Sequence, residues 1–149
     1  MSERSLIRIL YFVLSFTWGA MLSIPGALIF LILCAANCPV RKNGFGWAVV
    51  VGKGSSGFSM GPFSILNREY DEYLLNHEFG HSIQNCIFGP LMLPVIVIPS
   101  VIRYWYRVYR FNHGTRYNEL RGYYDIWFEK TASSFGTRIK ERYWLIDDD

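Results

Sequence analysis

The stretch Asn76-His77-Glu78-Phe79-Gly80-His81 decides how this chain is expected to fold. Residues at positions i and i+4 project from the same face of an α-helix, so His77 and His81 are predicted to lie one turn apart. The other residues around this motif are uncharged, as a buried metal-binding helix requires. We predict that the helix begins after an N-cap at Asn67 and ends at Gly89-Pro90.

The paired histidines are suited to binding zinc. Both imidazoles can reach one Zn²⁺ ion, and Glu78 beside the first of them can act as general base towards a water molecule. A catalytic zinc site takes three protein ligands, so a third must come from elsewhere in the chain. The downstream candidates are His113, Glu119, Asp125 and Glu129. An oxyanion stabiliser is also needed, and the residues of suitable chemistry are His113, Tyr117, Arg121, Tyr123 and Tyr124.

His77-Glu78-Phe79-Gly80-His81, taken with Glu129-Lys130-Thr131-Ala132, resembles the HExxH zinc metallopeptidases, the zincins, and among them the gluzincins. In gluzincins the third ligand is a glutamate on a later helix, commonly followed three residues on by a small residue. The resemblance implies that His77, His81 and Glu129 are the metal ligands and that Glu78 is the catalytic base.

This resemblance is local and covers residues 68–85 and 125–133. The apolar stretch between them is more similar to the membrane-bound gluzincins, which are much larger proteins. No metzincin HxxGxxH arrangement follows His81. Asp125 lacks the glycine-containing context of the site-2-type intramembrane proteases, so that family ranks behind the gluzincins.

The region before the motif is predicted to form a β-hairpin or two short strands, Trp47–Val51 and Phe58–Leu66, separated by a Gly- and Ser-rich turn. Gly61-Pro62 within the second strand predicts a bulge or an edge strand, because proline cannot donate to a ladder. The zincin resemblance implies an edge strand that holds substrate backbone by strand addition. A hairpin that only covers the helix is the alternative.

Two apolar blocks hold much of the 51% of residues that are hydrophobic. Ile9 to Ala36 has no charged residue over 28 positions, enough to cross a hydrocarbon core of about 30 Å and too long for the core of a cleaved signal peptide. We predict a retained anchor, either a helix kinked at Pro25-Gly26 or a re-entrant hairpin. Residues 87–102 are short for a full crossing. They are predicted to form a broken or re-entrant segment partly immersed in the membrane, with a buried helix of the protease core as the alternative.

Basic residues follow the second apolar block. Residues 103–142 carry nine Lys or Arg against four Asp or Glu, interleaved with Trp and Tyr. This pattern favours phospholipid headgroups as the partner, not nucleic acid. The positive-inside rule places the catalytic part in the cytoplasm. Three cysteines, an odd number, argue against a disulfide framework.

The sequence therefore predicts an α+β, mostly helical fold in which a zincin-like active helix and a short β-hairpin follow a transmembrane segment. Residues 1–42 are expected to form the membrane anchor, and residues 43–149 the metallopeptidase domain, with a second long helix at Tyr117–Gly136. The function expected is that of a membrane-anchored, Zn²⁺-dependent peptidase acting on peptide or protein substrates near the bilayer. The alternative is a non-catalytic small membrane protein that uses a zincin-like fold for binding or structure.

Overall fold

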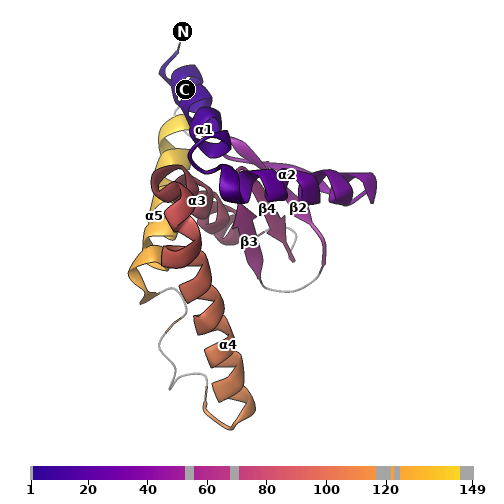
Figure 1. Ribbon diagram of the computed structural model, residues 1–149, viewed down its shortest axis with the longest axis vertical. Helices are drawn as coiled ribbons and strands as arrows, with labels where there is room; N and C mark the ends of the chain where they lie inside the picture. The colour runs from indigo at the N-terminus through magenta and orange to yellow at the C-terminus, as the bar shows by residue number, and fades with distance from the viewer. Residues whose placement is uncertain (1, 53–55, 68–70, 117–121, 123–124, 145–149) are drawn as a thin grey trace.

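The computed structural model describes residues 2–52, 56–67, 71–116, 122 and 125–144. It confirms an α+β architecture that is mostly helical and contains one small mixed sheet (Figure 1). The helices are α1 (Glu3–Phe16), α2 (Ala20–Ala35), α3 (Glu72–Phe88), α4 (Ile98–Asn112) and α5 (Trp127–Trp144), with the short helical turns η1 (Gly89–Leu91) and η2 (Leu93–Val97). The strands are β1 (Val40–Asn43), β2 (Gly46–Val50), β3 (Gly57–Met60) and β4 (Phe63–Leu66).

The sheet has the order β1-β2-β4-β3 and contains two hairpins. β2 and β4 are parallel, whereas β1–β2 and β3–β4 are antiparallel. Of the two predicted alternatives, a hairpin between residues 47–51 and 58–66 is therefore wrong: residues 47–50 pair with 63–66, but in parallel. Gly61-Pro62 does not form a bulge either: it is the tight turn between β3 and β4, which Gly61 can make because its φ is +60°. The strand order places β3 at an edge of the sheet, so the predicted edge strand is confirmed for β3.

The first apolar block forms two helices, not one kinked helix. α1 and α2 meet at an angle of 95° across Thr17–Gly19, while Pro25 lies inside α2. The Pro25-Gly26 pair has a packing role here, because a Cβ added to Gly26 would lie 2.5 Å from the carbonyl oxygen of Met60 in β3. The predicted break at Pro25 was thus wrong in position.

None of the described helices is by itself both long and apolar enough to cross a bilayer. Two bent pairs reach the required length and composition only when joined: α1 with α2, and Glu72–Leu91 with Leu93–Asn112, which are bent by 115°.

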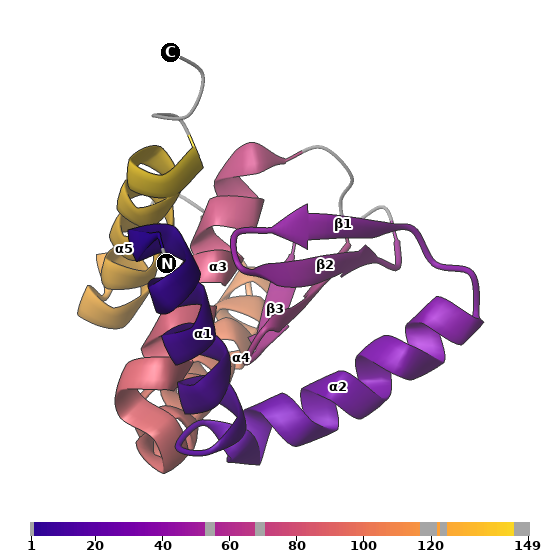
Figure 2. The same ribbon diagram turned by 90° about the horizontal axis from the view of Figure 1, so that it is seen from above.

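The N-terminal helices pack onto the rest of the chain (Figure 2). The hydroxyls of Tyr11 in α1 and Ser82 in α3 form a buried hydrogen bond. The Asn85 amide nitrogen of α3 donates to the Gly19 carbonyl at 3.2 Å. The boundary expected after residue 42 falls inside β1, which starts at Val40.

Helix α3 begins later than the sequence predicted. Asp71 is its N-cap and accepts a hydrogen bond from the Leu74 backbone N–H at 3.1 Å. Asn67 instead donates its side-chain amide to the Ser56 hydroxyl at 2.9 Å. Gly89, with φ +53°, ends the helix as expected. Helix α5 runs from Trp127 to Trp144, so it continues past the predicted end at Gly136, and the described residues Gly122, Asp125 and Ile126 before it are not α-helical. The rest of the predicted N-terminal part, residues 117–121 and 123–124, lies outside the described part of the chain.

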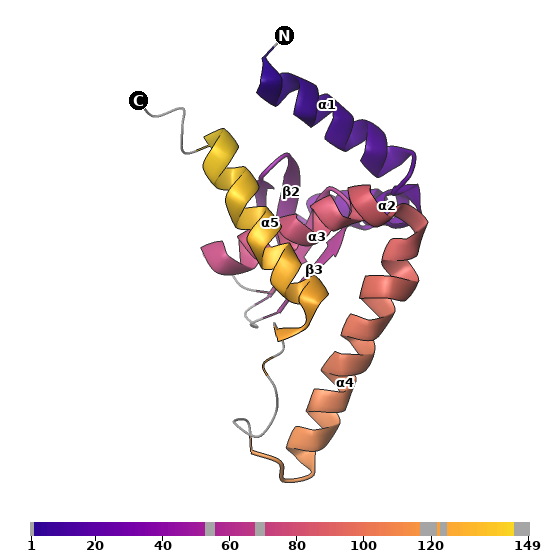
Figure 3. The same ribbon diagram turned by 90° about the vertical axis from the view of Figure 1, so that its left-hand side faces the viewer.

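Helices α3 and α5 cross in close contact (Figure 3). Glycines permit this approach: a Cβ on Gly80 would lie 1.8 Å from the Ala132 carbonyl oxygen, and one on Gly136 would lie 1.7 Å from that of Asn76. Real atoms do not approach so closely, so any larger side chain would separate the two helices. On its other side, α3 buries Phe79 against Tyr11 and Phe45.

Replacing Gly80 by alanine should push α5 away from α3. We expect Gly80→Ala to lower the free energy of unfolding by about 1–3 kcal/mol, the usual cost of overpacking a tight core. Gly52→Ala is the matched control, because the nearest atom to its added Cβ would be at an ordinary 3.4 Å. Thermal unfolding of both variants measures the difference, and equal melting temperatures would contradict the close crossing.

Candidate metal centre

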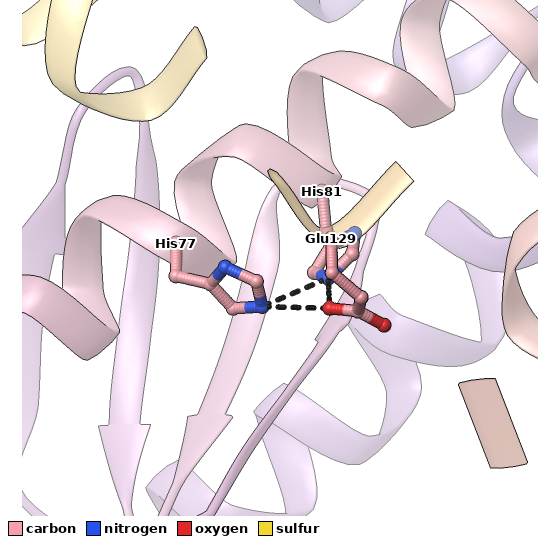
Figure 4. A group of neighbouring side chains, drawn as sticks. All are labelled: His77, His81 and Glu129. Carbon is pink, nitrogen blue, oxygen red and sulfur yellow. Dashed lines mark hydrogen bonds and ion pairs between the residues drawn. The ribbon is translucent and has the colours of Figure 1, made fainter. Parts of the chain in front are cut away.

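Three side chains from two helices converge on one point (Figure 4). α3 presents His77 and His81 from successive turns, and α5 presents Glu129 opposite them. The two Nε2 atoms are 3.1 Å apart, and Glu129 Oε2 lies 3.0 Å from His77 Nε2 and 3.2 Å from His81 Nε2. The side chains of His77 and Glu129 are 4% and 1% exposed, so the group is buried as well as compact.

These separations fit a bound metal ion. Ligands at about 2.0–2.1 Å from a tetrahedral Zn²⁺ ion lie roughly 3.3 Å from one another. The observed distances between donor atoms, 3.0–3.2 Å, are close to that value. The group of His77, His81 and Glu129 can therefore hold a metal ion.

Hydrogen bonds behind the ligands fix the proton on His81. Gln84 Nε2 donates to the Phe128 carbonyl at 2.7 Å, which turns Gln84 Oε1 towards His81 Nδ1 at 2.8 Å. An amide oxygen can only accept, so Nδ1 carries the ring proton. In the neutral ring, Nε2 is then unprotonated and directs its lone pair at the centre of the group.

A serine fixes His77 in the same way. Ser133 Oγ lies 2.8 Å from His77 Nδ1 and donates its own proton to the Glu129 carbonyl at 3.3 Å. The serine hydroxyl therefore accepts from Nδ1, and Nε2 of the neutral ring faces the group without a proton. Two nitrogen lone pairs and a carboxylate oxygen therefore meet at one buried point. A cation bound there would offset the repulsion between these electron-rich atoms and the cost of burying the carboxylate.

The carboxylate of Glu129 is also oriented from behind. Ser100, in α4, donates to its Oε1 at 2.5 Å and so leaves Oε2 facing the histidines. Burial alone would raise the pKa of Glu129. When the imidazoles are protonated at Nε2 as well, hydrogen bonds from His77 and His81, together with that from Ser100, hold this pKa well below its usual range. Burial likewise lowers the pKa of His81, yet its bond to Glu129 and the charge of Glu78 together raise it.

Glu78 is a second buried carboxylate beside the group, 3% exposed. Ser59 in β3 donates to its Oε2 at 2.8 Å. β3 passes directly against this carboxylate, since a Cβ on Gly57 would lie 2.6 Å from Oε1. Burial raises the pKa of Glu78, while the neighbouring histidines and Ser59 oppose that rise. A carboxylate in this position can accept a proton from a neighbouring group and return it.

One cavity of about 680 Å³ is lined by all four side chains, His77, Glu78, His81 and Glu129. Its walls come from β3, from α3, and from η2 together with α4. Apolar side chains make up most of the lining. This is the form expected of a site that binds an organic ligand next to a metal.

The structure brings together Glu78, His77, His81 and Glu129, as expected from the sequence. Among the other candidate third ligands, His113 caps the far end of α4, Asp125 is not part of the group, and Glu119 lies outside the described residues. The remaining oxyanion candidates, Tyr117, Arg121, Tyr123 and Tyr124, also lie outside the described part of the chain.

The supporting residues Ser59, Ser100, Ser133 and Gln84 were not predicted from the sequence. Helical spacing offered a signal for two of them: Gln84 follows His81 by three residues, and Ser133 follows Glu129 by four. No comparable signal existed for Ser59 or Ser100, which come from other elements.

Comparison with protein-family models, with curated proteins and with solved structures gives no match.

Removing the acceptor for His77 should weaken metal binding. We expect Ser133→Ala to reduce zinc affinity by about tenfold, the lower end for loss of a residue that orients a ligand. Ser134→Ala, one position further along α5, is the matched control and should leave the affinity unchanged. Competition with a chromophoric chelator measures both values. Equal affinities in the two variants would show that Ser133 does not orient His77.

Proposed function

We propose that this chain is a zinc-dependent peptidase attached to a membrane. The observation that carries the proposal is the placement of a buried carboxylate, Glu78, in the same cavity as a three-ligand metal group. His77, His81 and Glu129 hold the zinc ion, and Glu78 is the general base. The same set of residues is implied by the resemblance to gluzincins.

Each residue has a separate task in peptide hydrolysis. A bound zinc ion supplies a Lewis acid that polarises the substrate carbonyl and activates water near pH 7. Glu78 takes a proton from the attacking water and delivers it to the leaving amine. Ser59 holds the carboxylate by its hydrogen bond to Oε2, so that the other oxygen, next to Gly57, is available for proton transfer.

Strand β3 supports this proposal because it can position the substrate. It pairs with β4 on one side, and its residues Gly57 to Ser59 line the cavity. Within the described residues no strand pairs with its outer edge. An extended peptide can add to such an edge by main-chain hydrogen bonds, which would place its backbone beside Glu78.

The ligand set favours catalysis over a structural role for zinc. Structural zinc sites take four protein ligands, whereas three side chains converge here among the described residues. The fourth position is the one that water or substrate occupies in a catalytic site. Glu78 is also buried, and burying a carboxylate lowers the stability of the folded protein. A structural zinc site needs no general base, so only a catalytic site explains why this carboxylate is there.

Replacing Glu78 by glutamine tests the catalytic role. We expect Glu78→Gln to abolish cleavage of a casein or peptide-library substrate, because an amide cannot accept the proton from water. The zinc content should stay at the wild-type level. Glu72→Gln, in the exposed first turn of the same helix, is the control and should retain full activity. Cleavage that persists in Glu78→Gln would overturn the mechanism.

Attachment to a membrane is supported by the outer faces of α1 and α2. Their exposed residues are mostly large and apolar, a surface that water disfavours and lipid accepts. We propose that these helices contact the bilayer and that the catalytic part faces the cytoplasm. The exposed side chains include Leu6, Ile9, Leu10, Val13, Phe16, Met21, Ile24, Leu28, Leu31 and Ile32.

Charges placed on this face should reduce membrane binding. We expect the double variant Leu28→Glu, Ile32→Glu to lower the fraction of protein that floats with phospholipid vesicles, because ionised carboxylates resist transfer into the bilayer. Val51→Glu changes an exposed apolar residue outside these helices and should not alter flotation. Equal flotation of all three proteins would argue against α2 as a membrane-binding helix.

A further inference from the structure

Helix α4 carries an apolar stripe that the described protein leaves uncovered. None of its residues is buried, and Figure 3 shows the helix extending away from the body. Along one side, large apolar residues recur every three or four positions, the spacing of a single helical face. These residues all line the cavity that contains the metal group: Val97 at the end of η2, then Val101, Tyr104, Val108 and Phe111.

The stripe starts at the metal centre and leads away from it. Ser100, in the first turn of α4, donates a hydrogen bond to the candidate metal ligand Glu129. Phe58 of the edge strand β3 and Leu74 of α3 line the same cavity. The groove thus joins an apolar wall, an exposed strand edge and a candidate catalytic centre in one continuous space.

We propose that this groove selects its substrate: an extended polypeptide segment of about six residues with bulky apolar side chains on the side facing α4. The inference rests on the proposed peptidase function and adds a substrate class to it. The segment lies along β3 at the reacting end, and its side chains cover the stripe from Val97 to Phe111.

The length follows from the size of the stripe. Val97 and Phe111 are 14 residues apart, which corresponds to about 21 Å at a helical rise of 1.5 Å per residue. An extended chain rises about 3.3 Å per residue, so roughly six residues cover that distance. Dipeptides and tripeptides would reach only the first part of the stripe.

The preference for apolar side chains follows from the lining. Arg107 is the single Lys or Arg among the described lining residues, and the two acids, Glu78 and Glu129, belong to the metal centre. A charged substrate side chain placed against the valines of the stripe would lose hydration without gaining a partner. An apolar side chain would instead remove two apolar surfaces from water.

The test measures binding separately from cleavage. Zinc-loaded full-length Glu78→Gln protein in detergent is titrated into labelled, end-capped peptides, and the fluorescence anisotropy is followed. One peptide series alternates Leu and Phe over two, four, six and eight residues; the second replaces these residues by Ser and Asn. Tyr104→Ala removes a side chain from the groove. Tyr106→Ala removes the same side chain from a position on α4 outside the lining.

We expect the apolar six-residue peptide to bind at least about tenfold more tightly than its polar counterpart, in line with the apolar area it would bury. Affinity should rise up to six residues and then level off. Tyr104→Ala should weaken binding by about tenfold, while Tyr106→Ala changes it less than about twofold. Partition of peptide into detergent micelles would not distinguish the two tyrosine variants.

Three results would overturn the inference: equal affinity for apolar and polar peptides, equal effects of the two tyrosine variants, or absence of peptide binding. If no peptide binds and the protein forms a dimer that Tyr104→Ala dissociates but Tyr106→Ala does not, the stripe is the surface that contacts a second copy of the chain. Each of these outcomes leaves the peptidase proposal intact if wild-type protein cleaves peptides in a Glu78-dependent way. Failure of that cleavage is a separate result.

Discussion

The close crossing of α3 and α5 is the constraint on which the site depends. Without side chains at Gly80 and Gly136, the two helix backbones meet at Ala132 and Asn76. This brings Glu129 of one helix within 3.2 Å of both histidines of the other. A carboxylate and two imidazoles would not otherwise share a buried point, because each loses hydration there and gains little from the others unless a cation is bound.

The polar groups behind the ligands turn this contact into a defined donor set. Gln84 and Ser133 settle which nitrogen of each ring carries the proton, and Ser100 settles which oxygen of Glu129 faces inwards. Ser100 belongs to α4, so the helix that forms the apolar wall of the cavity also orients a ligand. A substrate bound along α4, as proposed, would therefore lie on the same helix that orients Glu129.

The residues of the metal group could be predicted from the sequence more accurately than the strand pairing and the helix boundaries. The i, i+4 spacing predicted that His77 and His81 meet, and the resemblance to gluzincins selected Glu129 from four candidate third ligands. Long-range features could not be predicted in this way. The parallel pairing of β2 with β4 depends on contacts between distant segments, and Pro25-Gly26 resembles a helix break although Gly26 serves to pack α2 onto β3. The N-cap prediction failed because Asn67 and Asp71 are both suitable caps and the tertiary structure uses Asp71.

The most direct test of the account is the zinc content of the purified protein. Wild type should contain one zinc ion per chain, and His77→Ala and Glu129→Ala should contain little or none. Asp125→Ala should keep the ion, because Asp125 is not part of the converging group. Well-folded wild-type protein that takes up no zinc after reconstitution would contradict the account, as would loss of zinc from Asp125→Ala but not from Glu129→Ala.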